Sequence, residues 1–194
     1  MSFEVLHPIF LVKEIINKYG DGLSLKFSKY LYEPGSVFDV REDFSIEASH
    51  VTLDWFGEME ANLVEEWELA QTSIVISKDG RERHLGMIDF IGRPPLHALL
   101  DGVRTLLGPE ILGSLYIFDS GRSYHGYVCK LMNVKKWRDF QYRLLLMNKV
   151  GQVPIIDSRW VAHRLLGGYS SLRWSAESHI HSEKPKLIWP KVLR

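Results

Sequence analysis

Between residues 84 and 175 the sequence changes repeatedly between two hydrophobic periods. Alternating or continuous apolar runs, typical of β-strands, are separated by stretches whose apolar residues recur every three or four positions, as in α-helices. The expected strands are 84–91, 111–118, 125–132 and 170–175. With the helices placed between them, the order is strand, helix, strand, turn, strand, helix, helix, strand. This order predicts an α+β fold in which helices flank a mixed or antiparallel sheet.

The helices expected in this half have recognisable ends. Asn133 and Asp157 each precede an amphipathic stretch and have the character of N-cap residues. Gly108 stands where the first helix should stop. The three helices are expected after Pro94-Pro95 up to residue 107, from 134 to about 149, and from 158 to 167.

We expect the first 80 residues to form an N-terminal α/β extension, in which we identify no motif of a known family. Apolar residues at helical intervals and a following Gly20 predict a helix over 8–19. Residues 22–56 indicate strands and loops, and 57–70 an acidic helix. A strand at 72–77 precedes a hairpin turn. We expect residues 1–80 to pack on a core at 84–190, as one domain over 1–194.

Composition excludes several classes of protein. The single cysteine, Cys129, excludes an intramolecular disulfide and a cysteine-rich zinc site, and its apolar surroundings indicate burial. No basic start leads into a long apolar run, and no apolar stretch approaches the length of a membrane span. We therefore expect a cytoplasmic protein with no membrane partner.

The two halves of the chain carry opposite charge. Residues 1–97 contain 9 Lys/Arg and 17 Asp/Glu, a net charge of −8, whereas residues 98–194 contain 15 and 7, a net charge of +8. A basic half suggests an anionic partner. Packing of the two halves against each other, with complementary charge, explains the asymmetry equally well.

Three segments of the second half carry candidate chemistry. The sequence MIDFIG places Asp89 near the end of an apolar strand. FDSGRSYHGYV is a glycine-containing turn between two strands, which presents Ser120, Arg122 and His125. VPIIDSRWVAHRLLGG places Asp157 after an apolar run, and LRWS follows it with Arg173.

These segments resemble, in order and spacing, the three motifs of the archaeo-eukaryotic primases: an acidic strand end, a small-x-His hairpin and an apolar-Asp motif, with a later arginine. The resemblance covers about residues 84–190 and implies an RRM-like, primase-type sheet with flanking helices. It implies that Asp89, His125 and Asp157 are catalytic, with Asp89 and Asp157 binding Mg²⁺ or Mn²⁺. Ser120, Arg122, His125 and Arg173 are then expected to bind the phosphates of a nucleoside triphosphate.

The chemistry of such a site agrees with these residue types. Nucleotidyl transfer needs a divalent metal to neutralise the triphosphate, and hard ions take carboxylate oxygens. Arginine donates to phosphate in a two-pronged way. One departure stands out: the family has Asp-x-Asp in its first motif, whereas this chain reads Asp89-Phe90-Ile91. Asp119, beside the hairpin, is a candidate replacement.

The sequence therefore leaves three functions open. The first is a DNA primase or polymerase-like nucleotidyltransferase of DNA replication, acting on single-stranded or template–primer DNA, with a helicase or another replication or repair protein on another chain. The second is an inactive nucleotide- or nucleic-acid-binding module that keeps the fold. The third is a structural protein with a fortuitous motif order.

His179-Ile180-His181 is expected in a solvated tail. The expected nucleic-acid-binding residues are Arg138, Arg143, Arg159 and Lys184.

Overall fold

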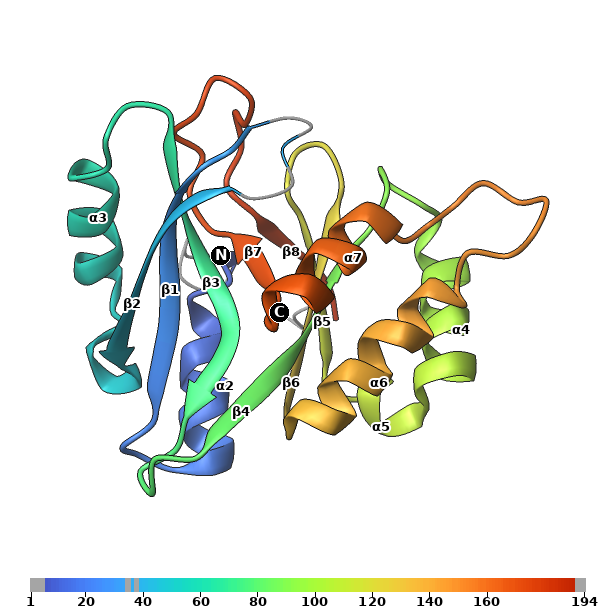
Figure 1. The fold of residues 1–194 in the computed structure, drawn as a ribbon, viewed down its shortest axis with the longest axis horizontal. Helices are drawn as coiled ribbons and strands as arrows, with labels where there is room; N and C mark the ends of the chain where they lie inside the picture. Colours follow the sequence, from blue (N-terminus) through green and yellow to red (C-terminus); the bar gives the residue numbers. More distant parts are fainter. Residues whose placement is uncertain (1–5, 34–35, 37–38, 191–194) are drawn as a thin grey trace.

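Eight strands form one sheet in the computed structural model, which describes residues 6–33, 36 and 39–190 (Figure 1). The strand order is β2-β1-β3-β4-β6-β5-β8, and β7 pairs separately with β3. All pairings among these strands are antiparallel. The expected α+β fold is confirmed. The strands are β1 Ser24–Leu31, β2 Val40–Glu47, β3 Trp67–Ile76, β4 Glu82–Asp89, β5 Leu115–Asp119, β6 Tyr124–Met132, β7 Ser171–Arg173 and β8 Lys186–Trp189.

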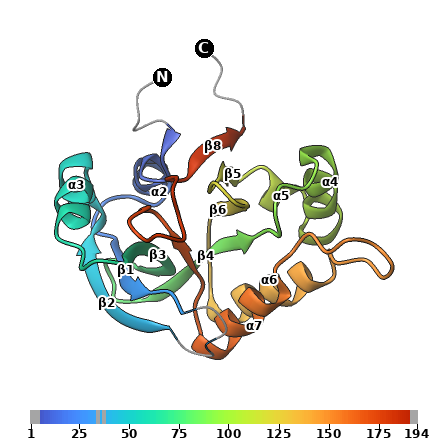
Figure 2. The ribbon, with the colours of Figure 1, turned by 90° about the horizontal axis from the view of Figure 1, so that it is seen from above.

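Helices cover both faces of the sheet (Figure 2). Alternation along the strands divides the core, because successive side chains point to opposite faces. In β6, Tyr127 and Cys129 join the cluster under α2 and α3, whereas Val128 joins the cluster under α4 to α7. The elements of the first face are α2 Phe10–Tyr19, the 3₁₀ turn Ala48–His50 and α3 Leu53–Ala61. Those of the second are α4 Leu96–Leu107, α5 Pro109–Leu112, α6 Val134–Leu145 and α7 Ser158–Gly167.

The sheet divides beside β3. Near its end, β3 pairs with β4 through Ile74–Ile76, but earlier residues, Ala70–Thr72, pair with β7 instead. Strands β3 and β4 therefore diverge away from their hairpin, and β7 lies in the opening. Strand β4 goes on to pair with β6 up to Asp89. The ends of β4 and β7 and the start of β6 consequently meet in one region.

Most elements expected in the second half are present. The four expected strands contribute to a single sheet. Asn133 caps α6 by accepting a hydrogen bond from the Lys136 N–H at 2.9 Å, although the helix ends at Leu145 rather than near Lys149. Cys129 is buried, as expected. No helix among the described residues is long and apolar enough to span a membrane.

The helix expected over 57–70 is wrong. Helix α3 ends at Ala61, Glu66 adopts a positive φ of 69°, and β3 begins at Trp67. Glu68 and Leu69 are fully buried in that strand, between β1 and the chain after β7. Long-range pairing overrides the local helix preference here.

Two further expectations need correction. The strand expected over 111–118 begins only at Leu115, because Pro109 opens a short helix at 109–112 after Gly108. The expected polar tail contains β8, which pairs with β5 at the edge of the sheet. Four residues of strand are too short to show a periodic pattern.

Candidate active site

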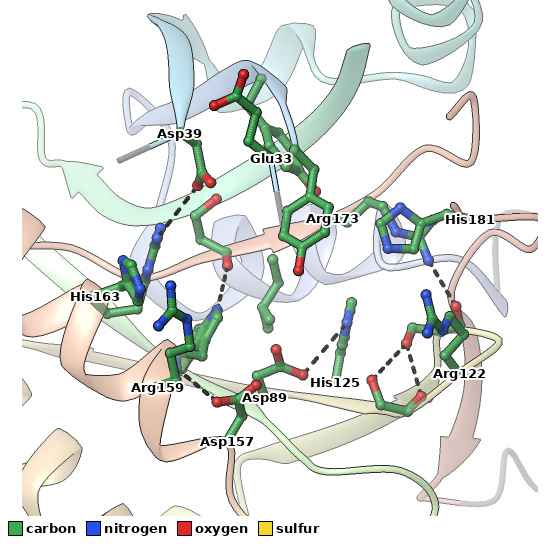
Figure 3. Close-up of a pocket in the computed structure, with 18 of the residues that line it drawn as sticks. Glu33, Asp39, Asp89, Arg122, His125, Asp157, Arg159, His163, Arg173 and His181 are labelled. Carbon is green, nitrogen blue, oxygen red and sulfur yellow. Dashed lines mark hydrogen bonds and ion pairs between the residues drawn. The ribbon is translucent and has the colours of Figure 1, made fainter. Parts of the chain in front are cut away.

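A pocket of about 220 Å³ opens where β4, β6, β7 and the start of α7 meet (Figure 3). It is lined by every residue that the sequence assigned to metal, catalysis or phosphate: Asp89, Ser120, Arg122, His125, Asp157 and Arg173. The structure thus brings together side chains that lie up to 84 positions apart in the chain.

Backbone hydrogen bonds place Asp157 beside Asp89. The Asp157 N–H donates to the Asp89 carbonyl at 3.0 Å, and the Ile91 N–H donates to the Ile155 carbonyl at 3.0 Å. Between them, Phe90 and Ile156 form an isolated antiparallel bridge. Residues 155–157 therefore run as an added strand along the end of β4. Both carboxylates lie on the floor of the pocket (Figure 3).

This proximity changes the chemistry of Asp89. Burial, and then the neighbouring carboxylate of Asp157, raise its pKa to about 8, although Arg164 and Arg173 oppose the shift. Without a bound cation, the Asp89 carboxyl group is therefore largely protonated at neutral pH. A cation between the two carboxylates would relieve their repulsion.

Asp157 has a second role as the N-cap of α7. Its Oδ1 accepts a hydrogen bond from the Trp160 N–H at 2.9 Å. The other end of the helix is closed by Gly168, which adopts a left-handed conformation with φ of 81°. The two ends follow the expected pattern. One carboxylate oxygen thus fixes the helix, and the second remains available to the pocket.

His125 is the direct neighbour of Asp89 on the adjacent strand. The two residues are partners in the β4–β6 register, and Nε2 of His125 is 4.0 Å from Oδ1 of Asp89. Burial, with the positive charges of Arg173 and His181, lowers the pKa of His125 well below its usual value. The imidazole is therefore neutral at neutral pH, and its contact with protonated Asp89 is not an ion pair. Its buried Nδ1 has no hydrogen-bond partner within the described residues.

The turn Ser120–Ser123 joins β5 to β6 at the edge of the pocket. Within the turn, the Ser120 N–H and Oγ donate to the Ser123 carbonyl, each at 2.9 Å, and the Gly121 N–H donates to Oδ1 of Asp119 at 2.9 Å. Gly121 has a φ of 94°, which favours glycine. Arg122 at its tip is exposed, and the hydrogen bonds and ion pairs found among the described residues do not involve its side chain.

Arg173 holds this turn in place. It is 4% exposed, and its guanidinium donates to three backbone carbonyls: Ser120 at 2.8 Å, Glu183 at 3.1 Å and Ser175. Three of its five N–H groups are therefore already used. The sequence assigned Arg173 to the phosphates, and the structure adds a second role, which is to connect the turn to the segment after β7.

The four residues expected to bind nucleic acid are dispersed. Arg159 lines the pocket and donates to the Ser36 carbonyl at 3.0 Å. Arg138 and Arg143 are exposed on α6, where Arg143 pairs with Asp139 at 2.8 Å. Lys184 pairs with Glu60 of α3 at 2.6 Å. The pocket thus gathers only one of the four.

Several lining residues were not expected from the sequence. Strands β1 and β2 of the N-terminal half bring Tyr30 and Arg41, and the guanidinium of Arg41 lies 4.7 Å from the centre of the Tyr30 ring. Asp39 pairs with both Arg41, at 2.6 Å, and Arg164 of α7, at 3.7 Å. Their only signal in the sequence is residue type, because their proximity depends on long-range strand pairing. His181, which was expected in a solvated tail, also lines the pocket.

Position 91, where the family resemblance would place a second acid, is occupied by an isoleucine. Ile91 is 44% exposed and stands two residues after Asp89. Asp119 does not take its place, since its carboxylate pairs with Arg93 at 3.0 Å, accepts from the turn, and lies outside the residues that line the pocket. Among the described residues, no group of three or more His, Cys, Asp or Glu side chains could hold a metal ion.

A protein-family model described as archaeo-eukaryotic primase 1D-like matches residues 47–186, well over half of the sequence. The chain belongs to this archaeo-eukaryotic primase-like family. The matched range of this primase-like chain contains all six residues expected at the pocket, and it begins before residue 84, where the resemblance was placed. Tyr30, Asp39 and Arg41 lie before it.

The crystal structure of the primase RepB′ has a similar fold, with a TM-score of 0.53 and 13% sequence identity. The similarity covers 93% of this primase-like chain and 55% of the RepB′ chain, so the chain spans about half the length of that structure. At this identity the likeness concerns the fold alone, and it extends to the N-terminal half. No curated protein sequence matches the chain.

Proposed function

We propose that this chain is a primase-type nucleotidyltransferase whose pocket binds a nucleoside triphosphate and Mg²⁺ or Mn²⁺. One observation carries the proposal. Backbone pairing of residues 155–157 with the end of β4 sets Asp89 and Asp157 side by side, in a pocket that is also lined by His125 and by Ser120 and Arg122 of the turn. Two acids and a cationic, hydroxyl-rich turn in one pocket suit a metal–triphosphate complex.

The two carboxylates fit one divalent cation. Mg²⁺ commonly binds through one or two carboxylates and completes its shell with water and substrate phosphates, so a group of three protein ligands is not needed. Burial first, and the Asp157 carboxylate second, raise the pKa of Asp89, and a bound cation would favour its ionised form. Because Ile91 replaces the second acid of the first motif, we propose one protein-bound cation rather than two.

In the proposed reaction, a hydroxyl group loses its proton to solvent, and its oxygen attacks the α-phosphorus of the bound nucleotide. The new P–O bond forms as the bond between the α-phosphorus and the bridging oxygen breaks and pyrophosphate leaves. A bound cation would neutralise charge on the phosphates. Asp89 and Asp157 would hold it. Arg122, whose donors have no partner among the described residues, would contact the phosphates. Neutral His125 would offer a hydrogen bond without adding charge. Arg173 would fix the turn, and its remaining N–H groups would donate to the phosphates.

The remaining parts of this function are also proposals. The growing strand and its template are DNA, bound as a single strand or as template and primer, in DNA replication. Arg159 at the mouth of the pocket, with Arg138 and Arg143 on α6, would contact backbone phosphates. A helicase or another replication or repair protein on a separate chain would act together with this domain.

The direct test is incorporation of a labelled nucleotide by the wild type and by Asp89→Asn and Asp157→Asn. Asparagine keeps the size of each side chain, and at position 157 it can also keep the helix cap. Each substitution should reduce incorporation by at least 10²-fold, because stabilisation by a metal is worth several kcal/mol. The matched control is Asp101→Asn, an exposed acid of α4 outside the pocket, which should retain full activity. Activity that survives loss of both pocket acids would refute the assignment.

A second candidate, an inactive module that binds nucleotide, is favoured by one observation: the apolar Ile91 in the first motif. In that case the wild type would bind triphosphate but incorporate none with either Mg²⁺ or Mn²⁺. Ile91→Asp would then be the informative gain-of-function variant, since it restores the acid pattern of the family.

A further inference from the structure

One buried carboxylate anchors the segment that follows β7. Glu68 of β3 is fully buried and accepts hydrogen bonds from the Ser178 Oγ at 2.6 Å, the Ser178 N–H at 3.1 Å and the Glu177 N–H at 3.2 Å. The Ser175 hydroxyl also donates to it. Nδ1 of His181 completes the set at 3.2 Å. Residues 175–181 are thus fixed to the sheet around a single side chain.

These hydrogen bonds determine the charge of Glu68. Burial alone would raise its pKa, but the donors from His181, Ser175, Ser178 and Glu177 outweigh burial and lower the pKa to about 2. Glu68 is therefore a carboxylate, which can only accept hydrogen bonds. It follows that Nδ1 of His181 carries a proton. Nε2, on the opposite edge of the ring, makes no hydrogen bond within the described part of the chain.

His181 lies on the side of the pocket where the phosphates are proposed. It lines the pocket, and its charge contributes to the lowered pKa of His125. In Figure 3 it lies beside Arg122 and Arg173. The segment just after it packs on the turn, since Arg173 bonds to the Glu183 carbonyl and a Cβ at Gly121 would lie 3.1 Å from that of Glu183.

We propose that His181 is a further phosphate-binding residue of this pocket, and that Glu68 is the positioning residue that holds its ring. The proposal rests on the proposed function, because it assumes that a triphosphate occupies the pocket. With Glu68 on one edge of the imidazole and a phosphate oxygen on the other, the ring lies between two anions. Both ring nitrogens then donate, and the phosphate receives a charge-assisted hydrogen bond.

Two substitutions separate the two edges of the ring. The amide nitrogen of Asn can take the place of Nδ1, so His181→Asn keeps the bond to Glu68 and removes the donor to the pocket. The amide nitrogen of Gln can take the place of Nε2, so His181→Gln keeps the donor and loses the bond to Glu68. The matched control is His179→Asn, in the same segment, because His179 pairs with Glu66 and does not line this pocket.

The experiment measures the dissociation constants of ATP, dATP and adenosine by calorimetry with Mn²⁺, together with the melting temperature of each full-length variant. His181→Asn should weaken triphosphate binding about ten-fold, the value of one charge-assisted hydrogen bond, and leave the melting temperature unchanged. His181→Gln should lose less affinity but melt earlier. Adenosine affinity should change little, and His179→Asn should match the wild type.

The outcomes distinguish this inference from the proposed function. If the wild type binds ATP and dATP but His181→Asn binds them equally well, His181 does not contact phosphate and only the inference fails. An equal loss for adenosine and ATP would place His181 at the base or sugar and overturn it as well. Failure of the wild type to bind either triphosphate would overturn both proposals.

Discussion

At the scale of single residues, two ionisable side chains of the pocket have strongly shifted pKa values. Burial and the Asp157 carboxylate raise the pKa of Asp89 to about 8. His125 is held neutral by burial and by nearby cations. Both pKa shifts arise first from burial and second from like charges nearby, and both effects cost stability in the absence of a ligand. Such perturbed groups in one pocket are typical of functional sites.

The shift of Asp89 predicts how stability depends on pH. The pKa of Asp in an unfolded chain is about 3.9. Between that pH and pH 8, the folded chain therefore binds more protons than the unfolded chain. Over this window, Asp89 lowers the free energy of unfolding as pH rises. Asp89→Asn should therefore melt like the wild type at pH 4 and at a higher temperature at pH 9, in EDTA. Parallel melting curves for the two proteins across this range would contradict the assignment.

Arg173 and Arg122 both line the pocket, but they should behave differently. Arg173→Ala leaves three backbone carbonyls without their donor, at a cost of about 1–3 kcal/mol for each buried group. It should therefore lower stability, measured by urea unfolding, as well as triphosphate affinity. Arg122→Ala should lower only the affinity. Equal loss of stability in the two variants would argue against the anchoring role of Arg173.

At the scale of elements, the sequence predicted correctly those features that depend on neighbouring residues, such as helix N-caps. Asn133 and Asp157 were expected as N-caps, and both accept the expected hydrogen bond. The helix expected over 57–70 does not form, because Glu68 lies in a strand and accepts hydrogen bonds from donors more than 100 residues away. Strand β8 was missed because its partner β5, rather than its own four residues, makes it a strand.

The candidate site follows the same division. Its motif residues could be found by order and spacing, because they stand at strand ends and in a turn. The contributions of Tyr30, Asp39 and Arg41 could not, since the pairing of β1 with β3 and of β2 with β1 brings them to the pocket. The role of Arg173 as an anchor was also invisible, because its acceptors are backbone carbonyls that carry no sequence signal.

Helix α7 offers a test of the two roles of Asp157. Asp157→Ala removes the cap, and should cost about 0.5–2 kcal/mol in the free energy of unfolding. Asp157→Asn keeps an oxygen for the Trp160 N–H and should cost less. Nucleotide incorporation should be lost in both. If Asp157→Asn retained activity, residue 157 would act only through the cap, and its negative charge would not be needed.

At the scale of the whole molecule, the charge asymmetry has two structural consequences. Part of it is used in packing between the halves, since Lys184 pairs with Glu60, and Arg164 with Asp39. The rest remains exposed on α6 and at the mouth of the pocket, where Arg138, Arg143 and Arg159 lie. Both explanations of the asymmetry therefore apply, to different residues.

This division predicts the salt dependence of binding to single-stranded DNA. Each phosphate contact that is lost should reduce the slope of log K against log salt by about 0.7, because fewer counterions are released. Arg159→Gln should produce such a change, and Arg143→Gln a similar one if the strand crosses α6. Lys184→Gln should instead lower the melting temperature and leave the slope unchanged, since its charge is balanced by Glu60. Fluorescence anisotropy over a range of salt concentrations measures all three slopes. A steep wild-type slope that only Lys184→Gln reduces would move the DNA path from the mouth of the pocket to the α3 side of the sheet.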